Sequence, residues 1–495
     1  MEYTHLSEFE IRSGTLSIWT PELPAAAWRP DARPLTSVHA GYCAGVDPAD
    51  PLPGRGRWIG TVFEMDAPFE AAAWRETLRR WHARHEGLRT TVDAAARTRS
   101  TAAADELVIV EQPIEDLTDG TEINEFLRGA LELRLSPLVW PHCLAATVDH
   151  RDTGDFTVLV AADHSVLDAY SQAILILELR ALYTEAVAGL PARASATFGS
   201  SADYAVLERA AAAAIDPNSP AVATWRDFLA DGSMPRFAPR AQRPVEAGLP
   251  QPSVSRRILD LVDLERVEAA LDAVRHRMSV AVFAALALAN RQRFGDGGLR
   301  TVMPIATRPD LRWLESMGWF VNVVPVEIAL DDTDGIADAL DRSRAALRRA
   351  RTAGDASWNR VLELLEVAET PRFGVSFLDI RVLPGYELVA DLRGRTLRAE
   401  SYSPDEVFLW VVRAADGLYV STRYPAGFAA DAMEEFLTEF GHALRAITAM
   451  ASVPQHTELA AAPTPADPVG HAHSPTATPD RDGAPDPLTG AAQVV

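Results

Sequence analysis

The sequence has 495 residues, of which 47% are hydrophobic and 23% charged, enough for a well-buried core divided between two domains or subdomains. Its formal net charge of −22 argues against nonspecific binding to nucleic acid, whose phosphates require clustered cations, and against anionic membrane surfaces. No stretch approaches the roughly 18 consecutive apolar residues of a membrane-spanning helix, and the first residues lack a signal-peptide layout. We therefore expect a cytoplasmic protein without membrane insertion.

Strands and helices alternate along the first part of the chain. A segment rich in tryptophan and proline covers residues 1–35. Tryptophan and leucine residues at helical intervals predict a helix over 70–86. Apolar runs predict strands over 58–66, 106–111 and 142–148.

The most informative segment lies between Asp155 and Asp168, where an apolar strand gives way to a helix. Period-two alternation places His164 at the end of the strand, on the face that carries its apolar side chains. A neutral imidazole at this position can accept a proton from a hydroxyl or an amine, because its unperturbed pKa of about 6.5 is close to working pH. Helical spacing begins at about Asp168. This spacing alone also occurs by chance, so a structural role stays open for both residues.

Proline and glycine residues between Gly189 and Pro252 indicate a linker region that carries helices over 201–215 and 221–229. The second half of the chain repeats the alternation of the first. Its predicted helices cover 263–277, 280–294, 336–351 and 430–450, and its predicted strands cover 300–305, 322–330, 374–380, 407–413 and 418–424. The dipeptide Asp416-Gly417 predicts a tight turn between the last two strands.

Beyond residue 452 the composition shifts to Ala, Pro, Asp and Thr, which predicts a disordered tail. We therefore divide the chain into an N-terminal subdomain, a linker region with helices, a C-terminal subdomain and the tail. These cover residues 1–190, 191–255, 256–452 and 453–495.

Arginines between residues 342 and 351 form the densest basic cluster of this acidic chain. At helical spacing, Arg344, Arg348 and Arg351 share one face. Such a face could bind the phosphates of coenzyme A or of a phosphopantetheinyl carrier protein. A solvated helix face is the alternative.

Three residue types limit the possible chemistry. Cys43 and Cys143 are the only cysteines, and they have neither metal-ligand spacing nor the pattern of a disulfide framework, so we expect structural thiols. The scattered histidines give no zinc signature, and we expect no metal. The sequence contains no lysine, which excludes a Schiff-base mechanism.

An ordered set of segments resembles the superfamily of condensation domains from nonribosomal peptide synthetases and polyketide-associated acyltransferases. His164 and Asp168 resemble the HxxxD core of its HHxxxDG signature, although Asp163 replaces the first histidine and Ala169 replaces the glycine. Further matching segments cover residues 84–91, 303–309 and 318–326, and residues 34–42 resemble the first helix of condensation domains. Segments 359–364, 376–379 and 408–412 resemble in particular the free-standing acyltransferases that esterify trehalose and related glycolipid precursors.

The resemblance implies an α+β fold of two chloramphenicol acetyltransferase-like αβ-sandwich subdomains, arranged as a V-shaped pseudo-dimer with a central tunnel. His164 would lie at the midpoint of this tunnel, where a thioester-bound acyl group enters from one mouth and a nucleophile from the other. The imidazole would accept the proton of the attacking nucleophile and return it to the departing thiolate. No acyl-enzyme is needed.

The resemblance also implies roles for three further residues. Asp168 would form a structural salt bridge with Arg308 that clamps the two halves together. Asn322 and Ser376 could each donate a hydrogen bond to the oxyanion. The alternatives are that Asn322 satisfies local backbone groups and that Ser376 is a small packed residue.

We therefore expect an acyltransferase that moves an acyl group to a hydroxyl of a sugar, polyol or natural product. Its donor would be acyl-CoA or acyl-phosphopantetheine, with no tightly bound cofactor. A free-standing condensation enzyme that forms an amide, and a noncatalytic docking protein with the same fold, stay open as alternatives. We expect a monomer that acts on a small-molecule acceptor, with an acyl or peptidyl carrier protein as a possible partner.

Overall fold

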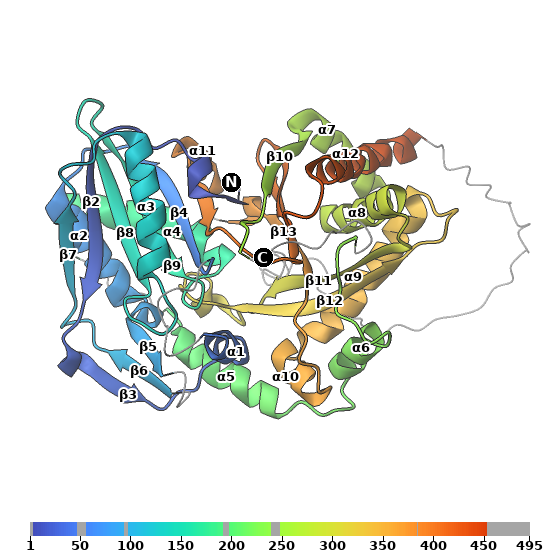
Figure 1. Cartoon of the computed structure of the whole chain (residues 1–495), viewed down its shortest axis with the longest axis horizontal. Coiled ribbons are helices and arrows are strands. Elements are labelled where there is room, and N and C mark those ends of the chain that lie inside the picture. The colour runs from blue at the N-terminus through green and yellow to red at the C-terminus, as the bar shows by residue number, and fades with distance from the viewer. Residues whose placement is uncertain are drawn as a thin grey trace, which may run out of the picture.

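Two sheet-containing lobes lie side by side in the computed structural model (Figure 1), which describes residues 3–46, 56–93, 98–191, 198–238, 248–383 and 385–452. The N-terminal lobe holds a seven-stranded sheet and a small three-stranded sheet, and the C-terminal lobe holds a six-stranded sheet. This arrangement confirms the predicted α+β fold with two αβ halves. The predicted tail, 453–495, lies outside the described residues.

The seven-stranded sheet of the N-terminal lobe has strand order β1-β14-β4-β9-β8-β2-β7. Its strands are β1 (Tyr3–Thr4), β2 (Thr15–Glu22), β4 (Trp58–Met65), β7 (Val108–Pro113), β8 (Cys143–His150), β9 (Asp155–Asp163) and β14 (Arg395–Arg398). The small sheet consists of β3 (Trp28–Asp31), β6 (Thr98–Ala102) and β5 (Thr90–Asp93), and the helices are α1 (Ser37–Ala44), α2 (Ala71–Arg84), α3 (Gly120–Arg134) and α4 (Ala169–Val187).

Alternation along β9 explains why helices cover both faces of this sheet. Phe156 and Val158 pack in one core with α2 and α4, whereas Leu159 and Ala161 pack in a second core with α3. Because successive side chains point to opposite faces, a strand buried on both faces is almost continuously apolar. The sheet therefore holds the end of β9 rigidly.

The six-stranded sheet of the C-terminal lobe has strand order β10-β16-β15-β13-β11-β12. Its strands are β10 (Ser253–Asp260), β11 (Gly298–Ala306), β12 (Val321–Ala329), β13 (Phe373–Asp379), β15 (Val407–Ala414) and β16 (Gly417–Arg423). The remaining helices are α5 (Ser201–Ala213), α6 (Pro220–Phe228), α7 (Leu261–Ala273), α8 (Met278–Phe294), α9 (Ile336–Gly354), α10 (Trp358–Leu364), α11 (Tyr386–Asp391) and α12 (Ala430–Ala446).

Helices α8, α9 and α12 share one large hydrophobic core with this sheet. Residues 280–287 of α8 are all buried, as expected for a helix that is apolar around its whole circumference. Tyr170 and Ala173 of α4 pack against Leu378 and Val412 of the C-terminal sheet. An apolar contact therefore joins the two lobes directly beside Asp168.

One strand from the C-terminal half of the chain belongs to the N-terminal sheet. Residues of β14, within the predicted C-terminal subdomain, pair antiparallel with β4 and parallel with β1 in the N-terminal sheet. Gln172 Nε2 of α4 donates a hydrogen bond to Leu397 O of this strand at 3.1 Å. The exchange ties the C-terminal half of the chain into the sheet that carries His164.

Candidate functional site

His164 follows β9 at the boundary between the two lobes. Its backbone N–H donates to Arg57 O at 3.1 Å, which continues the pairing of β9 with β4 and fixes the residue. The imidazole lies against the indole of Trp319 from the C-terminal lobe, with ring centroids 4.6 Å apart and an interplanar angle of 40°. The residue is partly exposed. Contacts from both lobes thus define the position of this ring.

The imidazole of His164 favours its neutral form. Burial lowers its pKa below the ordinary value, and the charge of Asp168 opposes this shift only in part. Nδ1 is buried and makes no hydrogen bond within the described residues. A neutral ring is the state in which a histidine can accept a proton.

Asp163 stands where the signature has its first histidine, and its carboxylate is fully buried. Oδ1 accepts a hydrogen bond from Ser165 N at 2.8 Å, and Oδ2 accepts one from the Tyr42 hydroxyl at 3.3 Å. Burial raises the pKa of Asp163 to about 6. The Asp163 side chain therefore fixes the turn after β9 and holds Tyr42 of α1.

Asp168 caps the N-terminus of α4, because its Oδ1 accepts a hydrogen bond from Ser171 N at 2.7 Å. Arg308 Nη2 lies 2.9 Å from Oδ1 and 3.1 Å from Oδ2 of the same carboxylate. One guanidinium nitrogen therefore reaches both carboxylate oxygens, whereas a bidentate pair would use two guanidinium nitrogens. Both side chains are 1% exposed, so the pair is a buried link between the lobes.

Arg308 extends this link to the segment that precedes β12. Its Nη1 donates to Trp313 O at 2.6 Å and to Ser316 O at 2.7 Å, while Phe320 N donates to Asp168 Oδ2 at 3.0 Å. The guanidinium also lies 4.4 Å from the ring centroids of both Tyr170 and Phe320. The Asp168–Arg308 pair thus clamps the segment that carries Trp319.

Asn322 binds backbone groups with both ends of its amide. Nδ2 donates to Gly354 O at 3.2 Å and to Ala356 O at 2.7 Å, and Oδ1 accepts from Val323 N and Trp358 N. The amide therefore has no donor left for an oxyanion, and these contacts favour the structural alternative. Asn322 braces the turn between α9 and α10.

Ser376 lies on β13 and is buried, and its hydroxyl makes no hydrogen bond with the described residues. Its neighbours Val375 and Phe377 belong to the helix-covered core of the C-terminal lobe. Because side chains alternate along a strand, Ser376 points to the opposite face of the sheet, toward the N-terminal lobe. Its hydroxyl is free to donate.

A cavity of about 530 Å³ lies between α8, α9 and the adjacent ends of β11 and β12; we call it the arginine cavity. The predicted donor-binding residues Arg344, Arg348 and Arg351 all line it, together with Arg275 and Arg277. The helix predicted over 263–277 ends at Ala273, so the last two arginines lie on the connection between α7 and α8. The sequence reasoning did not identify them.

Most charges of the arginine cavity lack a protein partner. Arg344 pairs with Asp341 at 2.6 Å, but the side chains of the other four arginines form no ion pair or hydrogen bond with any described residue. On the same helix, Arg342 lies outside the cavity and pairs with Asp331 and Asp334. An acidic protein therefore concentrates unpaired positive charge at one hollow.

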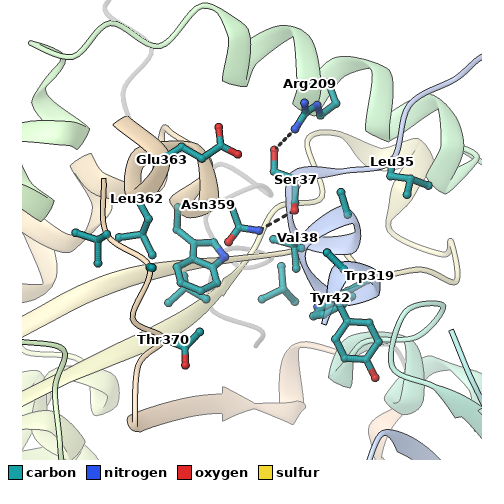
Figure 2. A pocket seen from close by; sticks show the side chains of 18 of the residues that line it. Leu35, Ser37, Val38, Tyr42, Arg209, Trp319, Asn359, Leu362, Glu363 and Thr370 are labelled. Carbon is teal, nitrogen blue, oxygen red and sulfur yellow. Dashed lines mark hydrogen bonds between the residues drawn. The ribbon is translucent and has the colours of Figure 1, made fainter. Parts of the chain in front are cut away.

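A second cavity, of about 590 Å³, lies between α1 and α10 and is called the α1–α10 cavity (Figure 2). Trp319, Trp358 and Tyr42 line it along with aliphatic side chains. Two hydrogen bonds cross its wall and are drawn in the figure: Asn359 Nδ2 donates to Ser37 O at 2.7 Å, and Arg209 donates to Ser37 Oγ at 3.0 Å.

The two cavities lie on opposite faces of β12, since Val323 lines the α1–α10 cavity and Val324 lines the arginine cavity. His164 lines neither of them. Its contact with the α1–α10 cavity runs through Trp319, which lines that cavity and packs on the imidazole. Sequence reasoning did not identify Trp319 or Tyr42, because their contacts with the His164 segment join residues more than 120 positions apart.

Metal and membrane features are absent from the part of the chain that the structure describes. No group of three or more His, Cys, Asp or Glu side chains among these residues could hold a metal ion. None of the described helices is long and apolar enough to cross a membrane.

Comparison with known families and proteins gives a consistent picture. The condensation-domain family model matches residues 58–464. The trehalose-2-sulfate acyltransferase PapA2 of Mycobacterium tuberculosis is 27% identical over 299 residues, 58% of this chain and 63% of that protein. Acyltransferase PapA3 of the same species is 25% identical over 284 residues, 54% of this chain and 58% of that protein. The matches thus span less than two thirds of these relatives.

Solved structures share the fold. A PapA2 acyl transferase structure superimposes with a TM-score of 0.77 at 20% identity, covering 90% of this chain and 100% of that one. The first condensation domain of the CDA synthetase gives a TM-score of 0.64 at 17% identity, covering 84% and 96%. At these identities the likeness concerns the fold.

Proposed function

Because the chain belongs to the condensation-domain family, we propose that it is an acyltransferase that moves an acyl group from a thioester to a hydroxyl of a sugar or another polyol. The observation that carries the proposal is the position of His164, a neutral imidazole at the junction of the lobes. The names of the relatives, trehalose-2-sulfate acyltransferase among them, support a sugar as acceptor.

In this mechanism His164 accepts the proton of the attacking hydroxyl as its oxygen forms a bond to the thioester carbonyl carbon. The carbon–sulfur bond then breaks, and the protonated imidazole gives its proton to the departing thiolate. Ser376 is the candidate to donate a hydrogen bond to the oxyanion, because its hydroxyl is free. Asp168 stays bound to Arg308 and does not take part in proton transfer.

The arginine cavity is the proposed donor site. Unpaired guanidinium groups bind phosphates well, and the phosphates of coenzyme A or of a phosphopantetheine arm would meet Arg344, Arg348 and Arg351 there. Ala306 lines this cavity and precedes Arg308 by two positions in the chain. One end of the arginine cavity therefore lies near the Asp168–Arg308 clamp beside His164, which supports its role as the donor site. The α1–α10 cavity, with its two tryptophans, is the proposed acceptor site.

The experiment incubates the full chain with decanoyl-CoA and, in separate reactions, trehalose, trehalose 2-sulfate and glycine methyl ester, with products read by mass spectrometry. Ester formation on a sugar is the expected result. Amide formation would replace the proposal with the condensation-enzyme alternative. No product from any acceptor, with decanoyl-CoA or with a decanoyl-phosphopantetheinyl carrier protein, would favour the docking protein.

A further inference from the structure

The arginines of the arginine cavity come from two separate segments of the chain. Arg344, Arg348 and Arg351 lie along one face of α9, in a row roughly 10 Å long at about 1.5 Å per residue. Arg275 and Arg277 lie on the connection between α7 and α8, and α8 packs against α9 in the C-terminal lobe (Figure 1). Positive charge therefore extends over more of the cavity than the α9 row alone would provide.

His276 holds the connection between α7 and α8 against the start of that row. Its Nε2 lies 3.7 Å from Asp341 Oδ1, and Arg344 Nη2 lies 2.6 Å from the same oxygen. The His276 side chain lines the cavity and is 7% exposed, and its Nδ1 is buried without a hydrogen-bond partner among the described residues. Arg275 and Arg277, on either side of His276, therefore lie at the Arg344 end of the cavity.

The N-terminus of α8 adds positive potential at the same end. Its N-cap residue, Arg277, makes no side-chain capping bond, and the N–H groups of residues 278–280 have no partner in the part of the chain that the structure describes. Ser279 and Val280, in the first turn of α8, line the cavity. Unpaired N–H groups at a helix N-terminus, together with the helix dipole, favour a bound anion. Guanidinium groups and a helix N-terminus therefore meet at one end of this cavity.

Arg275 has a backbone conformation that favours glycine. Its φ is +56°, because it ends α7 in a left-handed turn in which Arg275 N donates to Asp272 O and His276 N donates to Leu271 O. This conformation costs free energy for a residue with a side chain. No ion pair or hydrogen bond of the guanidinium with a described residue offsets that cost. An arginine held in this way indicates a side chain kept for binding.

The opposite end of the row approaches the junction of the lobes. Gly354, three positions after Arg351, lies so close to Ile305 that an added Cβ would stand 2.7 Å from its Cδ1. Ile305 lines the cavity near the end of β11, three positions before Arg308 of the clamp. The cavity therefore runs from its Arg351 end, near the clamp, to its Arg344 end, roughly 10 Å farther along α9.

Coenzyme A presents its phosphates in a matching order. From the thioester, the pantetheine arm leads first to a diphosphate and then, through the ribose, to a phosphomonoester on the 3′-hydroxyl. The phosphopantetheine of a carrier protein ends at a single phosphodiester. We propose that the Arg344 end of the cavity, with Arg275, Arg277 and the N-terminus of α8, is a subsite for the 3′-phosphate and selects a coenzyme A thioester over a carrier-bound one. The inference rests on the proposed function, and it adds the class of donor.

The kinetic test compares decanoyl-CoA with decanoyl-3′-dephospho-CoA, using the acceptor that gives product in the assay above. In the wild type we expect kcat/KM to be about tenfold higher for decanoyl-CoA, because the 3′-phosphate adds charge-assisted hydrogen bonds. Replacing both Arg275 and Arg277 by glutamine should lower this ratio about fivefold. Both side chains are exposed, so the double variant should fold.

The matched control replaces Arg342 and Arg349 by glutamine. These arginines lie on α9 outside the cavity, so the ratio between the two thioesters should match that of the wild type. A ratio near one in the wild type would overturn the subsite, and so would a ratio that falls equally in both double variants.

A binding measurement tests the subsite without turnover. Isothermal titration calorimetry of the full chain should show that coenzyme A binds about tenfold more tightly than 3′-dephospho-coenzyme A. This difference should shrink when Arg275 and Arg277 are both replaced by glutamine. ATP has a polyphosphate but no 3′-phosphate, so it should bind no more tightly than the dephosphorylated ligand. ATP that binds as tightly as coenzyme A would overturn the assignment, because the cavity would then be a general polyphosphate site.

The outcomes separate the two proposals. Equal transfer from both coenzyme A thioesters, or faster transfer from a decanoyl carrier protein than from decanoyl-CoA, would overturn the selective subsite and leave the proposed function standing. Absence of transfer to every acceptor, together with binding that depends on the 3′-phosphate, would overturn the proposed function and the donor role, while the phosphate subsite would stand.

Discussion

The two cavities on the two faces of β12 differ in whether their charged side chains have partners within the protein. In the arginine cavity, the side chains of four of the five arginines have no ion-pair or hydrogen-bond partner among the described residues. In the α1–α10 cavity the charges are engaged: Arg209 binds Ser37, Glu363 pairs with Arg360 and Glu369 pairs with Arg236. Unpaired cations favour a phosphate ligand, whereas aromatic walls with engaged charges favour a neutral one. One edge strand thus separates two chemically different sites, which agrees with the proposal that a phosphate-bearing donor binds on one side and a sugar or another polyol on the other.

The buried Asp168–Arg308 clamp beside His164 joins the two lobes, so its loss should have the largest effect on stability. Arg308→Met leaves the Asp168 carboxylate buried without its cation, which should cost about 3–5 kcal/mol of unfolding free energy. The matched control is Arg312→Met on the same segment, where the pair with Asp310 is exposed and should contribute little. Urea denaturation of both variants measures the difference. Equal urea midpoints for Arg308→Met and Arg312→Met would show that the clamp does not stabilise the junction between the lobes.

The charge difference between the cavities should appear in the KM for the donor. If the arginine cavity is the donor site, substituting Arg344, Arg348 and Arg351 by glutamine should remove three phosphate contacts of about 0.5 kcal/mol each, which would raise the KM for decanoyl-CoA roughly tenfold. The control substitutes Arg342 and Arg349, which lie on the same helix outside the cavity. The KM for the acceptor should stay unchanged in both variants. A donor KM that rises equally in the control would remove the arginine cavity from the donor site.

Filling the α1–α10 cavity should affect the acceptor alone. Ala368 is exposed and lines this cavity, so Ala368→Trp adds bulk there without disturbing the core. We expect the acceptor KM to rise about fivefold, or about 1 kcal/mol, with the donor KM unchanged. Ala430→Trp, at the exposed start of α12, is the control in the same steady-state assay. A change confined to the donor KM would reverse the assignment of the two cavities.

The smallest expected effect is a shift in pH dependence. Burial lowers the pKa of His164, so the neutral ring persists at lower pH than for a free histidine. The acid limb of kcat/KM should therefore have its midpoint below about 6.5, measured between pH 4.5 and 8. The pKa of Asp163 is raised to about 6, so this carboxyl titrates in the same pH range as the acid limb. Asp163→Asn removes that titration and serves as the control; its acid limb should keep the same midpoint. A midpoint above 6.5 in both proteins would contradict a neutral base whose pKa is lowered.

The sequence predicted the parts of this site that depend on local patterns. The alternation of β9 and the helical spacing after Asp168 located the strand, the turn and the helix around His164. The spacing of Arg344, Arg348 and Arg351 predicted a shared face, and the structure places all three in one cavity. In these cases neighbouring residues determine the backbone, so the pattern is visible in a short window.

Features that depend on distant contacts left no such pattern. β14 has four residues and pairs with β1 and β4, two strands that lie more than 300 positions earlier in the chain. The amide of Asn322 was given a possible oxyanion role, but carbonyls at positions 354 and 356 occupy its donors. Trp319 stood in a segment already noted for its family resemblance, yet its contact with His164 depends on how two lobes pack.

The most direct test of the account compares acyl transfer by His164→Ala with transfer by His442→Ala. His442 is 63% exposed on α12 and far in sequence from the site, so its loss should leave the rate unchanged. If His164 is the general base, its loss should lower kcat by about 10²- to 10⁴-fold, while the thermal unfolding midpoints of the two variants stay close. A His164→Ala variant that transfers acyl groups as fast as His442→Ala would contradict the proposed mechanism.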